Sequence, residues 1–171
     1  MYFNYITKKD IIQVEGGKNM IISLCGEFTD KMSIIDKLKD IYKEKLLVYD
    51  FHRCIFKTQI QTEKQKYELD NKYNDIAKSK KIYQKLVEEI TYDKTNKFLK
   101  NNKDSIIVLI SNNILYKDIN ATPFFAKSDL KILVTSKEKN NSLFNQKYNK
   151  KDFDYVINSI EKTNIRKLVK L

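Results

Sequence analysis

The feature that most limits the fold of this chain is a series of short apolar runs separated by helical patterns. The runs "MIISLC" (20–25), "SIIVLIS" (105–111) and "LKILVTS" (130–136) are typical of strands that are buried on both faces. Two weaker runs, "LLVY" (46–49) and "DYVINS" (154–159), bring the expected number of strands to about five. This alternation predicts an α/β fold, a three-layer doubly wound parallel sheet with helices on both faces.

The segments between these runs carry the spacing of helices. Residues 33–45 place Ile34, Ile35, Leu38 and Ile41 on one face, and residues 53–101, which lack proline and glycine, predict two or three helices. Gly16 and Gly17 predict the turn of an N-terminal β-hairpin extension, and the tail predicts a closing helix. Because no Pro/Gly/Ser-rich linker interrupts the pattern, we expect a single domain over residues 1–171.

The net charge of +11 makes nucleic acid one class of partner to consider. Only Arg53 and Arg166 are arginines, and arginine is the better bidentate reader of phosphate and guanine. The abundance of Lys, Asn, Ile, Tyr and Phe fits A- and T-rich codons, as in a large DNA virus, a phage or an AT-rich microbe. A solvated lysine coat therefore explains the charge more simply than a nucleic-acid interface does.

The remaining composition bounds the compartment and the chemistry. Cys25 and Cys54 form no C-x-x-C pair, and His52 is the single histidine, so a structural zinc site is not expected. The apolar runs are too short to span a bilayer, and the N-terminus lacks the layout of a secretory signal. We therefore expect free thiols, no membrane partner, and a place in the cytoplasm, or in the host cytoplasm or virion if the protein is viral.

The residues after the first apolar run raise the question of a phosphate loop. Residues 26–33, "GEFTDKMS", share the first glycine (Gly26) and the last hydroxyl (Ser33) of the pattern G-x-x-x-x-G-K-[ST]. Lys31 stands where the second glycine belongs, and Met32 stands where the lysine belongs. Three interpretations follow from the residues: an altered or inactivated phosphate loop, a working variant that uses Lys31, and an ordinary strand–turn–helix.

The order of elements over about four fifths of the chain resembles the P-loop nucleoside and deoxynucleoside monophosphate kinases, and dephospho-coenzyme A kinase. The resemblance rests on the frame of Gly26 and Ser33, on "LLVYDFHR" as second strand and acceptor corner, and on "DFDYVIN" (152–158) as last strand. It implies a P-loop kinase-like sheet with a degenerate phosphate loop. It also implies a helical insertion that covers the acceptor at about 53–101, and a lid at about 137–151.

The resemblance also implies roles for particular residues. Donor phosphates of ATP would contact Gly26, Thr29, Lys31 and Ser33, and Ser33 would also ligate Mg²⁺. Asp50 would orient the acceptor and Arg53 would bind its phosphate. Lid charges would come from Lys137, Lys139 and Lys147, where the family carries arginines, and Ser111 or Asn112 would stand near the metal.

Three functions remain open from the sequence. The first is a nucleotide-kinase-like protein that binds a nucleoside monophosphate or deoxynucleotide and has impaired ATP- and Mg-dependent phosphoryl transfer. The second is a catalytically inactive pseudokinase that serves as a binding or structural module, as a homodimer or within a larger protein assembly. The third is a basic nucleic-acid-binding protein.

Overall fold

The computed structural model describes residues 19–26, 28–111, 122–135 and 150–158. The sheet consists of β1 (Met20–Gly26), β2 (Leu46–Asp50), β3 (Ile106–Ile110), β4 (Leu130–Thr135) and β5 (Tyr155–Asn158). All neighbours pair in parallel, and the strand order is β2-β3-β1-β4-β5. The predicted α/β class and the five-stranded parallel sheet are confirmed, and the arrangement is consistent with a P-loop-like three-layer fold.

The interior strand β3 shows why the apolar runs are continuous. All five of its residues are buried. Ile106, Val108 and Ile110 join one hydrophobic cluster, whereas Ile107 and Leu109 join a second cluster on the other face. Because successive side chains of a strand point to opposite faces, a strand covered on both sides needs apolar residues throughout.

Helix α1 (Phe28–Tyr42) covers one face of the sheet with Ile34, Ile35 and Leu38, and a 3₁₀ turn, η2 (Lys43–Lys45), leads from it to β2. The other face packs against Phe51, Phe124, Phe125 and Phe153. Of these residues, Phe124 and Phe125 belong to the short helix α5 (Thr122–Ala126), while Phe153 follows the 3₁₀ turn η3 (Lys150–Asp152).

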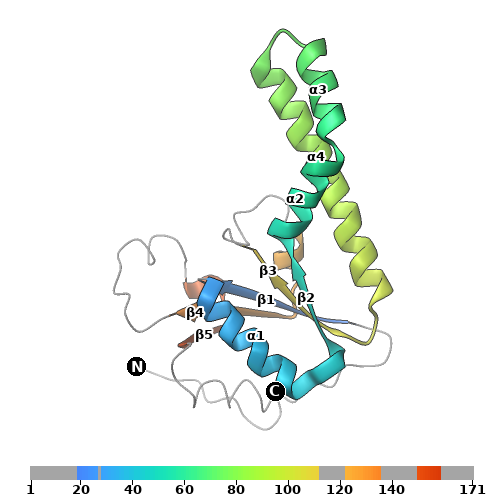
Figure 1. Ribbon diagram of the computed structural model, residues 1–171. Coiled ribbons are helices and arrows are strands. Elements are labelled where there is room, and N and C mark those ends of the chain that lie inside the picture. Colours follow the sequence, from blue (N-terminus) through green and yellow to red (C-terminus); the bar gives the residue numbers. More distant parts are fainter. Residues whose placement is uncertain (1–18, 27, 112–121, 136–149, 159–171) are drawn as a thin grey trace.

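Three helices between β2 and β3 form an arm that projects away from the sheet (Figure 1). They are α2 (Phe51–Gln61), α3 (Glu63–Lys72) and α4 (Ile76–Asn101), and α4 returns beside α2 and α3. Asp50 caps α2 and Asp75 caps α4, each by accepting backbone N–H groups of the first turn. The prediction of two or three helices at about 53–101 is therefore confirmed, with α2 beginning two residues earlier.

One predicted boundary is wrong. Residues 28–33 were expected in a loop that precedes a helix near Ser33, but α1 already begins at Phe28. The physical reason is that no proline or glycine stands after Gly26 to oppose helix formation, and helical spacing extends back to the buried Lys31. The predicted β-hairpin extension, closing helix and most of the lid lie outside the described residues.

Candidate functional site

The carboxyl ends of the five strands lie along one edge of the sheet, where parallel α/β proteins bind ligands. Adjacent strands β1 and β4 have connections that leave in opposite directions, because β1 leads to β2 and β4 leads to β5, on opposite sides of this pair. This switch point is the place where such folds form a crevice. Gly26 is the last residue of β1 and lies at this switch point.

Gly26 is needed for the close approach of β1 and β4. Its φ is +132°, and a Cβ atom built on it would lie 2.4 Å from the backbone oxygen of Val134. Side chains other than hydrogen do not fit this backbone or this space. The resemblance to P-loop kinases implies that Gly26 belongs to a phosphate loop, but this contact between neighbouring strands already explains the glycine.

The connection after Gly26 is too short for a phosphate loop. A single residue, number 27, separates β1 from α1. A phosphate loop needs several successive non-helical residues so that their backbone N–H groups turn inward around the phosphates. In this chain Thr29 lies in the first turn of α1, and residues 28–33 follow a helical path.

The side chain of Lys31 is buried and has a partner within the fold. Its side chain is only 2% exposed, and its Nζ donates a hydrogen bond to the backbone oxygen of Ser111, 2.6 Å away. An ammonium group that is removed from water needs such a partner, because burial of an uncompensated charge is costly. The structure therefore brings together two residues that the sequence analysis placed at the strand ends, and the bond ties α1 to the end of β3.

Lys31 and Ser33 lie on different sides of α1. They are two residues apart on α1, which is about 200° of rotation around the helix. Lys31 lies on the buried side, whereas Ser33 is only partly buried. In the frame G-x-x-x-x-G-K-[ST] the lysine and the hydroxyl are neighbours, so the one-residue shift of Lys31 separates two groups that phosphoryl transfer needs together.

Asp50 and Arg53 stand at the end of β2. The Oδ1 of Asp50 accepts a hydrogen bond from the backbone N–H of Arg53 at 3.2 Å, which caps α2. The side chain of Arg53 is exposed, and so is that of His52. The two residues predicted to bind an acceptor are thus adjacent, but the visible role of Asp50 is to start a helix. The predicted lid residues Lys137, Lys139 and Lys147, and also Asn112, lie outside the described residues.

A cluster that the sequence analysis missed joins β2 to the arm. The hydroxyl of Tyr49 donates to Sγ of Cys54 at 3.0 Å and lies 2.8 Å from Oγ1 of Thr95. Burial, together with the hydrogen bond to Cys54, raises the pKa of Tyr49 above its ordinary value. The sequence signal for this cluster is the pair of threonines at 91 and 95, which helical spacing places on one face of α4.

The arm holds a cleft of about 590 Å³ between α2, α3 and α4. Its wall includes Ile55, Gln59, Lys66, Lys80 and Tyr83. The cleft lies on the arm rather than among the strand ends, so it does not contain the predicted site residues. Across the described part of the chain, no group of three or more His, Cys, Asp or Glu side chains is placed to hold a metal ion.

A scan against protein-family models and a search of curated proteins find no match to this chain. Within the described residues, no helix is both long enough and apolar enough to cross a bilayer.

Proposed function

We propose that this chain is a nucleotide-kinase-like domain that is catalytically inactive and works as a binding or structural module. The observation that carries the proposal is the position of Lys31. In a helix that starts one residue after Gly26, its Nζ is buried against the backbone oxygen of Ser111. Phosphoryl transfer depends on positioned cations and amides around the phosphates, whereas among the described residues β1 is followed by helix α1 after a single position.

The direct test is a thermal-shift measurement with ATP, with and without Mg²⁺. A ligand at a hundred times its Kd stabilises the folded state by about 2.7 kcal/mol, which is roughly 5–10 °C in a domain of this size. We expect no shift with Mg-ATP and no ATP hydrolysis. A magnesium-dependent rise in melting temperature, or hydrolysis that the change Lys31→Met abolishes, would overturn the proposal.

A matched variant separates a degenerate loop from an ordinary turn. The double change Lys31→Gly with Met32→Lys restores the residues of the phosphate-loop pattern at positions 31 and 32. We expect it to lower stability and to gain no ATP binding, because the segment is helical and the glycine removes the bond to Ser111. A gain of Mg-ATP binding would show instead that the loop is recoverable, and would favour kinase ancestry with recent loss.

A second candidate is binding of a nucleoside monophosphate without phosphoryl transfer. The observation that favours it is the switch point between β1 and β4, where this class of sheet holds ligands irrespective of a phosphate loop. It predicts that one of the nucleoside or deoxynucleoside monophosphates raises the melting temperature in the absence of Mg²⁺. Equal melting temperatures across the whole panel would exclude this candidate.

A further inference from the structure

The arm formed by α2, α3 and α4 has an unusual distribution of polar and apolar side chains. Its most buried residues are mainly hydroxyl-bearing, and they are Thr58, Thr62, Ser79, Thr91 and Thr95. Apart from Phe51, which packs against the sheet, Val87 is the apolar side chain of the arm that is buried to the same degree. The contact between the helices of the arm is therefore polar in large part.

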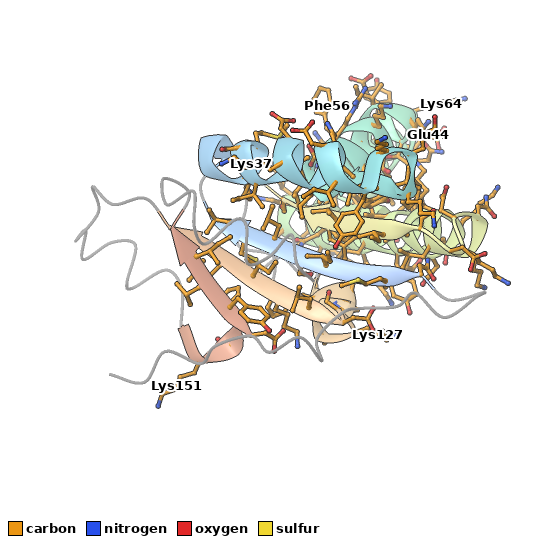
Figure 2. The ribbon with its side chains drawn as sticks, turned by 90° about the horizontal axis from the view of Figure 1, so that it is seen from below. Lys37, Glu44, Phe56, Lys64, Lys127 and Lys151 are labelled. Carbon is orange, nitrogen blue, oxygen red and sulfur yellow. The ribbon has the colours of Figure 1, made fainter. Side chains whose placement is uncertain are left out.

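Three large apolar side chains on α2 and α3 lie on the outside of the arm. Phe56, Ile60 and Tyr67 are 57%, 58% and 69% exposed. They are four and seven residues apart, and only Thr62 separates α2 from α3, so they follow one side of a nearly continuous helical segment. Figure 2, which looks along the arm, shows Phe56 and Lys64 on the same outer side. We refer to Phe56, Ile60 and Tyr67 as the apolar ridge.

An exposed apolar ridge is energetically unfavourable if the arm contacts only water. Burying one large apolar side chain is worth about 1.5–3 kcal/mol, and the arm leaves the three side chains of the ridge in water while it buries hydroxyl groups. Clusters of exposed apolar side chains on a folded surface commonly mark interaction sites. Charged side chains accompany the ridge: helical spacing places Glu63 on the same side, between Ile60 and Tyr67, and Lys64 at its border.

We propose that the apolar ridge is a dimer interface, in which the α2–α3 segments of two copies of this chain pack antiparallel. The proposal does not depend on whether the sheet edge binds a nucleotide. A two-fold axis would pass between Glu63 and Lys64, near the middle of the ridge. The paired segments, Phe51–Lys72, are about 33 Å long at 1.5 Å per residue.

The charges of the α2–α3 segment favour a second copy of this chain as the partner that covers the apolar ridge. With the axis between positions 63 and 64, Ile60 of one copy faces Tyr67 of the other, and Glu63 faces Lys64 twice by symmetry. Across residues 53–74 this register opposes no two like charges. Self-complementarity of this kind is what an isologous interface requires. Lys64 also lies 3.9 Å from Glu68 of its own helix, but that pair is exposed and contributes little.

The net charge of +11 does not prevent this contact under physiological conditions. At such ionic strength, charges separated by more than about 8 Å are largely screened from one another. The measurement is therefore sedimentation equilibrium of the full chain at physiological salt, over a range of protein concentrations. We expect a reversible dimer. A monomer at every concentration would overturn the proposal.

Two sets of variants locate the interface. Ile60→Glu and Tyr67→Glu should each raise the dimer dissociation constant by ~100-fold or more, because every change occurs twice in a symmetric interface. The control is Ile41→Glu, an exposed apolar residue on α1 outside the arm, which should leave the dimer unchanged. Circular dichroism verifies that each variant is folded. A dimer that persists in Ile60→Glu and Tyr67→Glu would contradict the assignment.

Charge exchange tests the antiparallel register. Glu63→Lys or Lys64→Glu alone places like charges opposite one another and should weaken the dimer. The double change Glu63→Lys with Lys64→Glu restores opposite charges on both sides of the axis and should recover affinity. A double variant as weak as the single variants would exclude this register, whereas recovery would not follow from a general effect of surface charge on stability.

Discussion

Among single residues, Lys31 is the one whose substitution tests for a structural role. Its buried ammonium donates to the backbone of Ser111, so we expect Lys31→Met to lower the free energy of unfolding by about 1.5–3 kcal/mol, the range for hydrogen bonds to charged groups. Chemical denaturation measures the change. Lys39→Met, an exposed position on the same helix, is the control and should change stability by less than about 0.5 kcal/mol. Equal stability of the two variants would show that the hydrogen bond from Lys31 to Ser111 does not stabilise the fold.

Tyr49 gives the fold a dependence on alkaline pH. Its pKa is raised by burial and by the hydrogen bond to Cys54, so the folded state favours the neutral phenol. The resulting stability is fully present below the unfolded pKa of about 10 and is lost as pH rises above it. We expect Tyr49→Phe to reduce this loss, as measured by denaturation at neutral and alkaline pH. The control Tyr92→Phe, at an exposed position outside the apolar ridge, should leave the alkaline loss as large as in the unchanged chain.

At the scale of elements, the threonines of α4 give a matched pair. The Oγ1 atom of Thr91 is buried with no hydrogen-bond partner among the described residues, whereas Oγ1 of Thr95 donates to the backbone oxygen of Thr91 and lies 2.8 Å from the hydroxyl of Tyr49. Thr91→Val should therefore be neutral or stabilising, and Thr95→Val should cost about 1–3 kcal/mol. Urea denaturation of both variants measures the difference. The opposite order would mean that the hydroxyl network of the arm is assigned wrongly.

How well the sequence predicts an element depends on what fixes that element. Residues 106–110 were predictable because burial on both faces demands an unbroken apolar run, and the three helices at 51–101 were predictable from spacing and the absence of proline and glycine. The start of α1 was not predictable, because a motif with matching ends at Gly26 and Ser33 suggested a loop. The bond between Lys31 and Ser111 joins residues 80 positions apart, and no local pattern reports such a contact.

At the scale of the whole molecule, the sheet and the arm are two parts with different roles. At the carboxyl ends of the strands of the five-stranded sheet, the residues near the switch point make contacts that stabilise the fold. Gly26 packs against Val134, and Lys31 donates a hydrogen bond to Ser111. The arm projects from the sheet and carries exposed apolar side chains (Figure 1). A fold by itself does not determine function, so loss of the loop at one site is compatible with use of another surface.

The central claim is that a helix, and not a phosphate loop, follows β1. The most direct measurement is the set of backbone ¹³Cα chemical shifts of residues 28–33 in solution. We predict helical shifts from Phe28 onward, continuous with the rest of α1 and unchanged when Mg-ATP is added. Non-helical shifts through Lys31, or a change of these shifts on addition of Mg-ATP, would contradict the account.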